Sequence, residues 1–232
     1  MTAVSAERIV VLISGRGSNA MAVIEGCHSG LIDGQVVKVI SDQPDAPGLK
    51  RAEAHDISTA CVNAAQHTDR SSLERALTAS IDEARPTLVV LAGFMRVLSA
   101  DFLAPYAGRI LNIHPSLLPR YRGLNTHARA LAAGDMEHGA SVHFVTTELD
   151  GGPVLSQASL TVHSTDTAAT LTERVLQLEH RLLPATVALL DKETVELNHE
   201  SIFINTTALA SPLRLGIELS DDGGLLSGAN CR

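Results

Sequence analysis

Short apolar runs alternate with helix-like stretches through the first half of the chain. Runs of β-branched and aliphatic residues predict strands at residues 9–13, 36–40, 59–62, 87–91 and 110–113. The stretches between them predict helices at residues 19–28, 48–55 and 70–84. Apolar runs without strict alternation are typical of strands buried on both faces, so this order predicts right-handed βαβ units and a parallel sheet.

The pattern changes after Asn112. A loop rich in Pro, Gly and Arg at residues 114–125 precedes a short predicted helix at 126–133 and predicted strands at 141–146 and 154–162. These later runs alternate more clearly, which favours strands with one wetter face. A long helix is predicted at 167–190, where apolar residues recur at steps of four, three and four: Leu171, Val175, Leu178 and Leu182.

We therefore predict an α/β fold. An open, mostly parallel twisted sheet has a Rossmann-like N-terminal half with helices on both faces, and the C-terminal half adds some antiparallel strands. No linker or repeat divides the chain, so residues 1–198 are expected to form one domain. Residues 199–232 are expected to form a C-terminal extension that is partly loose, since the tail from residue 211 is polar and rich in Asp and Gly.

Composition narrows the function classes. The 232 residues include 18 Lys+Arg and 26 Asp+Glu, a net charge of −8, with 3% aromatic residues and no Trp. Such a chain offers neither a basic footprint for nucleic acid nor platforms for stacking bases. Its three cysteines form no CxxC pair, and no apolar run reaches the roughly 18 residues that span a membrane. A cytoplasmic protein without nucleic-acid or membrane partners is expected.

A glycine-rich segment follows the first predicted strand. Its sequence, SGRGSN, ends in Gly17, Ser18 and Asn19, where a helix is predicted to begin. Glycines allow a tight turn, and the N–H groups of a helix start bind anions, so a phosphate site is one interpretation. The alternative is a tight turn capped by Ser18 or Asn19, because the third glycine of the dinucleotide fingerprint is missing.

Polar residues gather at the end of the last parallel strand. Alternation places Asn112 and His114 on one face, at the strand end where open α/β sheets bind ligands. Asp150 lies in the turn DGGP. If it contacts His114, its carboxylate favours the charged imidazolium, which is a proton donor. The alternatives are a hydrogen-bonded structural histidine and an Asp that only forms the turn.

A metal site is not expected. His114, His127, His138 and His143 cluster loosely in the sequence without the paired spacing of zinc sites. Most of them should be surface or hydrogen-bonded histidines.

Four motifs carry a resemblance to a known family. SGRGSN, VVLAGFMRVLS, NIHPSLLP and HGASVHFVTTELDGGPVLSQ occur in order over residues 8–197, and together they resemble the folate-dependent phosphoribosylglycinamide formyltransferases. The resemblance implies transfer of a formyl group from the co-substrate 10-formyltetrahydrofolate to the amine of 5'-phosphoribosylglycinamide, a step of purine (IMP) biosynthesis. No metal takes part, and a monomer or homodimer is expected.

The resemblance also implies residue roles. Asn112 and His114 stabilise the oxyanion, and Asp150 assists proton transfer through a water. Gly17, Ser18 and Asn19 hold the substrate phosphate, and Glu179 contacts its sugar. The folate site comprises the following residues: Arg70, Met95, Arg96, Val97, Leu98, Asn112, Thr146, Thr147, Glu148, Leu149 and Asp150. Glu179 and Arg70 could instead be solvated helix charges, and Met95, Val97 and Leu98 plain core residues.

One departure and three rival functions remain to be named. The chain has Arg122-Gly123 where relatives often have Pro-Gly, so Arg122 is expected either to loosen the loop or to contact a phosphate.

The nearest rival function is that of a formyltetrahydrofolate deformylase, a hydrolase with the same Asn, His and Asp residues. An enzyme that formylates methionyl-tRNA would need a further RNA-binding domain. The other rival is a non-catalytic nucleotide-binding module in which the His–Asp pair is structural.

Overall fold

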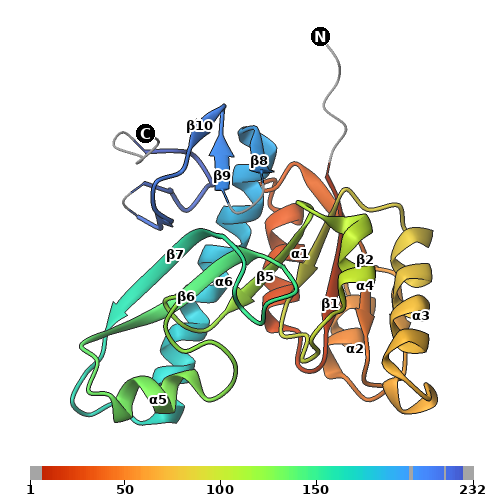
Figure 1. Cartoon of the computed structure of the whole chain (residues 1–232), viewed down its shortest axis with the longest axis horizontal. Coiled ribbons are helices and arrows are strands. Elements are labelled where there is room, and N and C mark those ends of the chain that lie inside the picture. The colour runs from red at the N-terminus through yellow and green to blue at the C-terminus, as the bar shows by residue number, and fades with distance from the viewer. Residues whose placement is uncertain (1–6, 199–200, 217, 227–232) are drawn as a thin grey trace. The chain divides into compact units, whose positions relative to one another are not determined.

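The structure is a computed structural model that describes residues 7–198, 201–216 and 218–226 (Figure 1). Its contacts divide the chain into two compact units, residues 1–111 and 112–232. Strand β5 (Ile110–His114) begins in the first unit and ends in the second.

The first unit is built on parallel strands in the order β4-β1-β2-β3. The strands are β1 (Glu7–Ile13), β2 (Gly34–Ser41), β3 (Thr59–Cys61) and β4 (Leu88–Leu91). In β1, every residue from Ile9 to Ile13 is fully buried, because a parallel sheet is covered on both faces. The start of β5 lies beside β4, where the Val89 N–H donates to the Arg109 carbonyl over 2.9 Å.

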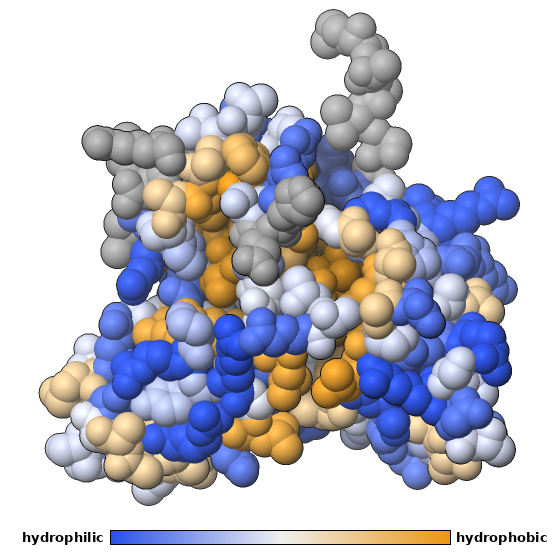
Figure 2. Space-filling view, in the orientation of Figure 1, coloured by the Kyte–Doolittle hydropathy of each residue, from blue (hydrophilic) through white to orange (hydrophobic). Residues whose placement is uncertain are grey.

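Helices connect these strands. They are α1 (Ser18–His28), α2 (Pro47–Glu53), α3 (Arg70–Glu83) and α4 (Ala100–Leu103), with 3₁₀ turns η1 (Ala64–Gln66) and η2 (Ala104–Tyr106). Both α1 and α3 contact β2, and Figure 1 draws them to either side of the strands. Helix α3 begins where the Asp69 carboxylate accepts the Ser72 N–H over 2.7 Å. Hydrophilic residues predominate at the position of α3, on the right of Figure 2.

The second unit packs a long helix against a mixed sheet. Its strands follow the order β11-β7-β6-β5, in which β6 (Glu137–Phe144) and β7 (Val154–Thr161) are antiparallel and β11 (Leu213–Arg214) runs parallel to β7. Helix α6 (Ala168–Lys192) contacts β6 and β7, and α5 (Thr126–Ala132) contacts α6. A separate antiparallel sheet comprises β8 (Val195–Asn198), β9 (Ser201–Ile204) and β10 (Thr207–Ala208).

The predicted fold class is confirmed, and the five predicted parallel strands coincide with β1 to β5. Strand β6 begins at Glu137, four residues before the predicted start at 141. Gly139 lies inside β6, where the backbone of β7 is close. A Cβ added to Gly139 would lie 2.0 Å from the Ala158 carbonyl oxygen. The glycine therefore serves a close backbone approach rather than a turn.

The sequence did not predict α4 or strands β8 to β11, which are too short to show a periodicity. In the tail, which was expected to be loose, Leu213 is 1% exposed because β11 pairs with β7. Residues 227–232 of that tail lie outside the described residues, and the expectation of one domain over residues 1–198 stays a prediction. Within the described part of the chain, no helix is long and apolar enough to cross a membrane.

Candidate active site

The end of β5 carries two of the predicted catalytic residues. Asn112 and His114 lie two positions apart on this strand, so their side chains share a face. His114 is 6% exposed, and Asn112 is half-buried. The adjacent strand β6 contributes His143, which is 2% exposed. Three polar side chains therefore gather where β5 and β6 lie side by side.

Both ring nitrogens of His114 face an acceptor. Its Nε2 lies 2.9 Å from the Tyr121 carbonyl oxygen. A carbonyl only accepts, so Nε2 carries a proton. Its Nδ1 lies 3.4 Å from Asp150 Oδ2, as an ion pair if the ring is charged. The ring is therefore held between a carbonyl and a carboxylate.

Asp150 comes from the loop between β6 and β7, and its side chain is 10% exposed. Its backbone is left-handed at φ 47°, a conformation that Asp tolerates better than most residues. Oδ2 accepts the Gly123 N–H over 2.8 Å as well as facing His114. The following Gly152 is needed because a Cβ there would lie 1.9 Å from the Phe144 carbonyl oxygen. The DGGP turn thus holds the carboxylate 3.4 Å from His114 Nδ1, a contact that the sequence had left open.

His143 fixes the amide of Asn112. Its Nδ1 lies 2.9 Å from the Phe144 carbonyl and must donate to it, which leaves the neutral ring with Nε2 as an acceptor. Burial lowers the pKa of His143, so this neutral form is favoured. Nε2 then accepts from Asn112 Nδ2 over 3.0 Å. The second amide hydrogen and Oδ1 of Asn112 are left for a ligand.

A second histidine pair adjoins this cluster. His127 Nδ1 and His138 Nε2 lie 3.1 Å apart, and the His138 ring meets the Tyr121 ring edge-on. Burial, followed by the neighbouring charge of His127, lowers the pKa of His138 to about 4. Burial also lowers the pKa of His127. Tyr121 in turn donates to Asp135 Oδ2 over 2.6 Å. These histidines are therefore neutral parts of the wall around the loop that carries Tyr121.

In the first unit, the glycine-rich segment turns directly into α1. Gly17 is the N-cap residue at φ 67°, and Ser18 begins the helix, so α1 starts one residue before the prediction. A Cβ on Gly17 would lie 2.9 Å from the Cα of Gly48, because the loop passes close to the start of α2. Because the N-cap residue Gly17 has no side chain, α1 has no side-chain hydrogen bond at its N-cap. The first-turn N–H groups of a helix have no intrahelical partners, so this end can receive an anion.

The loop after β4 is tied to the glycine-rich segment. The Ser14 N–H donates to the Gly93 carbonyl over 3.1 Å, and the Met95 N–H donates to Ser14 Oγ over 3.0 Å. Hydrogen bonds within the first unit thus join the predicted phosphate loop to Met95, the first residue of the predicted folate segment at 95–98.

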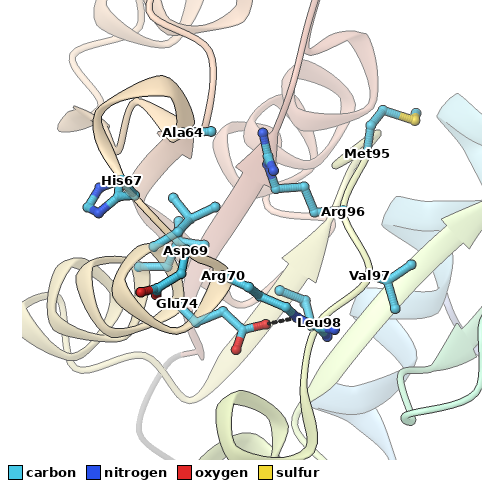
Figure 3. Close-up of a pocket in the computed structure, with 11 residues that line it drawn as sticks. Ala64, His67, Asp69, Arg70, Glu74, Met95, Arg96, Val97 and Leu98 are labelled. Carbon is cyan, nitrogen blue, oxygen red and sulfur yellow. Dashed lines mark hydrogen bonds and ion pairs between the residues drawn. The ribbon is translucent and has the colours of Figure 1, made fainter.

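A cavity of about 380 Å³ lies between this loop and α3. Figure 3 shows its lining side chains, which include five residues of the predicted folate site: Arg70, Met95, Arg96, Val97 and Leu98. Met95 and Val97 are 68% and 52% exposed, so they are not plain core residues, whereas Leu98 is 5% exposed. Ala64 and His67 also line the cavity, and sequence reasoning missed them because they lie in an irregular segment.

Two carboxylates orient the arginines of this cavity. Arg70 Nε lies 2.9 Å from Glu74 Oε1, and Arg96 Nε lies 2.5 Å from Oδ2 of the buried Asp42. Burial raises the pKa of Glu74, but hydrogen bonds from Ser99 and Arg70 outweigh it and leave the pKa below its ordinary value. The Arg96 guanidinium points away from Arg70 (Figure 3).

The remaining predicted residues lie in the second unit. The loop Thr146, Thr147, Glu148 and Leu149 leads into Asp150 and is mostly exposed. Arg122 forms an ion pair with Glu148, so it ties the loop at residues 114–125 to this loop rather than loosening it. Glu179 is 8% exposed on α6, so it is not a solvated helix charge. Sequence reasoning also gave no role to Tyr121 and Gly123, whose contacts with His114 and Asp150 run through the backbone.

No metal centre is evident. Among the residues that the structure describes, no group of three or more His, Cys, Asp or Glu side chains could hold a metal ion. The expectation of a metal-free reaction stays a prediction.

An amide and a histidine at a strand end, with a carboxylate 3.4 Å from the imidazole, form a site suited to acyl-group transfer on an α/β fold. The chain belongs to the formyl transferase family, which it matches over residues 7–187.

The relatives agree with this family. Phosphoribosylglycinamide formyltransferase of Escherichia coli strain K12 is 51% identical over 180 residues, 78% of this chain and 85% of that protein. The trifunctional purine biosynthetic protein adenosine-3 of Homo sapiens is 40% identical over 82% of this chain and 19% of its own length. The solved phosphoribosylglycinamide formyltransferase of Coxiella burnetii has a TM-score of 0.86 at 44% identity, covering 90% of this chain and 99% of that chain.

A formyltetrahydrofolate deformylase from Pseudomonas syringae pv. tomato shares the fold at a TM-score of 0.80. It is 24% identical to this chain, over 87% of this chain and 66% of that one. This likeness concerns the fold alone.

Proposed function

We propose that this chain transfers the formyl group of 10-formyltetrahydrofolate to the amine of 5'-phosphoribosylglycinamide. The products are formylglycinamide ribonucleotide and tetrahydrofolate, and the step belongs to de novo purine biosynthesis. The observation that carries the proposal is the cluster of Asn112, His114 and Asp150 in a chain 51% identical to a phosphoribosylglycinamide formyltransferase.

The chemistry follows from the geometry. The substrate amine attacks the formyl carbon, and the carbonyl oxygen becomes an oxyanion. The free amide hydrogen of Asn112 donates to that oxygen. The Nδ1–H of a protonated His114 also donates to it, since Nε2–H is held by the Tyr121 carbonyl and Nδ1 lies 3.4 Å from Asp150 Oδ2. Such donors often form the largest catalytic contribution. The bond between the formyl carbon and the folate nitrogen then breaks. The proton lost by the attacking nitrogen reaches the leaving nitrogen, with Asp150 assisting through a water.

The ligands are assigned to the residues that the family resemblance implies. Gly17, Ser18 and Asn19 bind the substrate phosphate through backbone N–H groups, since an anion is stabilised at a helix N-terminus. Glu179 contacts the sugar. Folate binds the residues of the 380 Å³ cavity and the loop before Asp150. Arg70 meets its anionic end, since guanidinium groups pair well with carboxylates, and Arg96 lines the pocket of the pterin ring.

No metal or resident cofactor takes part in this scheme, and 10-formyltetrahydrofolate is a co-substrate. We also propose that the protein works in the cytoplasm as a monomer or homodimer. The three cysteines without a CxxC pair and the net charge of −8 support an enzyme that binds small molecules in a reducing compartment.

An absorbance assay tests the function. Consumption of 10-formyltetrahydrofolate is measured with purified protein, with and without 5'-phosphoribosylglycinamide. Turnover that depends on the acceptor is the expected result. Equal turnover without acceptor would identify a hydrolase like the deformylases, and binding of both ligands without turnover would identify a non-catalytic module.

A further inference from the structure

A buried polar network lies beneath the loop that follows His114. Its side chains come from the loop and from both antiparallel strands: Ser116 and Ser141 are fully buried, and Gln157 on β7 is 6% exposed. Buried polar groups are costly unless they are hydrogen-bonded, so such a network must fit its surroundings closely.

The hydroxyl of Ser141 has its hydrogen-bonding capacity filled. Ser141 Oγ accepts the Leu118 N–H over 3.0 Å and donates to the Ser116 carbonyl over 2.7 Å. It also accepts from Gln157 Nε2 over 2.9 Å. A hydroxyl has one donor and two acceptor positions, and all three are used.

Gln157 donates both hydrogens of its amide within this network. One goes to Ser141 Oγ and the other to the Leu118 carbonyl, also over 2.9 Å. Because the nitrogen is the only donor on this side chain, the orientation of the amide is set by its partners. A carboxylate in its place would face the Leu118 carbonyl without a hydrogen to share.

The same loop holds His114. Ser116 Oγ donates to the Arg120 carbonyl over 2.6 Å, and the next carbonyl, of Tyr121, accepts from His114 Nε2 over 2.9 Å. The backbone from Ser116 to Tyr121 is thus fixed at its start by Ser141 and Gln157 and ends on the imidazole. The hydrogen bonds of Gln157 go to Leu118 and Ser141 and not to His114, so its influence passes through the loop.

We propose that Gln157 is a positioning residue for the proposed formyl transfer, which orients the His114 imidazole through Leu118, Ser141 and the carbonyl of Tyr121. Loss of its two hydrogen bonds lets the loop shift, so the Tyr121 carbonyl no longer holds His114 Nε2. A displacement of about 1 Å at a catalytic group can cost on the order of 100-fold in rate.

The test uses two variants in the full chain. Gln157→Met keeps the length without hydrogen bonds, and Gln157→Glu keeps the shape without the two donors. We expect kcat to fall roughly 10- to 100-fold while both KM values change less than about threefold, because bound substrates still meet their binding residues. The control is Gln35→Glu, at an exposed position on β2, which should leave kcat unchanged.

A second readout separates positioning from general weakening. In proton–nitrogen NMR spectra, the Nε2–H signal of His114, assigned by its absence in His114→Asn, should broaden or disappear in both Gln157 variants. If these variants do not fold, kcat and the Nε2–H signal are measured in Ser141→Ala instead, which removes a smaller side chain from the same network. Combined with Ser141→Ala, Gln157→Met should cost less than the sum of the two single losses, because the residues act through one network.

Two results would overturn the inference: folded Gln157 variants with normal kcat, or a lowered kcat with an intact Nε2–H signal. The NMR readout does not require the proposed reaction. A wild-type protein without formyl transfer, in which Gln157→Met still removes the Nε2–H signal, would contradict the function and support the positioning role.

Discussion

Asn112 and His143 are joined by a hydrogen bond of 3.0 Å between Nδ2 and Nε2, and its direction is fixed by the other nitrogen of His143. Nδ1 donates to the Phe144 carbonyl, so Nε2 can only accept while the ring is neutral. The lowered pKa of His143 keeps it neutral at pH 7. The amide of Asn112 is thereby prevented from flipping.

Replacing His143 by Phe should therefore reduce kcat. The substitution retains an aromatic ring but removes the acceptor, so the Asn112 amide loses its fixed orientation and donates less well to the oxyanion. We expect a loss of about 10- to 100-fold in kcat, since removing an oxyanion donor outright costs about 10²- to 10³-fold. Steady-state kinetics of His143→Phe, Asn112→Ala and the double variant check this. Losses that simply add would show that His143 does not act through Asn112.

Removal of the imidazole at position 114 should abolish most of the activity. His114→Ala is expected to lower kcat by at least about 10²-fold, because a charged donor to the oxyanion is lost. The melting temperature should stay close to that of the wild type, so the loss in rate is not a loss of folding. His163→Ala, at an exposed position of the same unit, is the matched control. Near-normal turnover of folded His114→Ala would show that His114 is not a catalytic residue.

Asp150→Asn tests the carboxylate with little disturbance of the backbone. Asn tolerates the left-handed conformation at φ 47°, and its carbonyl oxygen can still accept the Gly123 N–H. The negative charge beside His114 is lost, so the imidazolium is less stabilised and proton transfer slows. We expect kcat to fall about 10²- to 10⁴-fold, the range typical of general acid–base catalysis. Asp56→Asn, at another left-handed Asp (φ 59°), is the control and should keep full activity.

His138 should make the protein less stable in acid. Its pKa is about 4 in the folded protein against an ordinary value of 6.5, so the unfolded chain binds more protons between these values. The free energy of unfolding is then full above about pH 6.5 and falls as the pH is lowered towards 4.

Urea unfolding of wild type and His138→Phe at pH 7.5, 6 and 5 measures this contribution. The variant should lose some stability at pH 7.5, because the hydrogen bond to His127 is lost, but its stability should depend less on pH. His163→Asn should show the wild-type slope. A His138→Phe variant with an unchanged slope would mean that another group causes the acid sensitivity.

Gly17→Ala should weaken binding of the phosphate-bearing substrate. An alanine at φ 67° is strained by about 1 kcal/mol, and its Cβ would lie 2.9 Å from the Cα of Gly48. The start of α1 must then move, so we expect KM for 5'-phosphoribosylglycinamide to rise about tenfold or more with a smaller change for folate. The control is Gly30→Ala. An alanine at φ 77° has a similar backbone strain, but its Cβ would have no neighbour within 4 Å, so the KM for 5'-phosphoribosylglycinamide should stay normal. If both variants changed this KM equally, the glycine-rich loop would not be the phosphate site.

Much of the site could be predicted from local sequence. Asn112 and His114 are two residues apart on an apolar run, and this spacing alone puts both on one face at a strand end. The glycine-rich segment predicted both the turn and the start of α1 to within one residue. Short-range geometry suffices for such features, because backbone sterics and side-chain alternation act between neighbours in the chain.

Other features needed contacts between distant residues. The sequence did not indicate that Arg122 pairs with Glu148, that Asp42 holds Arg96, or that the neutral His143 accepts from Asn112. For Glu179 the sequence left a substrate contact and a solvated helix charge open, and its exposure of 8% excludes the second. Burial and partner choice depend on which strands and loops pack together.

The sequence by itself determined the alternation of strands β1 to β5 with helices α1 to α3, the glycine turn, and the presence of an amide and an imidazole at the end of β5. Only the tertiary structure decided how these groups are held. It places the Tyr121 carbonyl and Asp150 at the two nitrogens of His114, 2.9 and 3.4 Å away. The physical reason is that hydrogen bonding and desolvation fall off within a few ångströms, and residues 7 and 36 positions from His114 approach it only when the loops fold back onto β5.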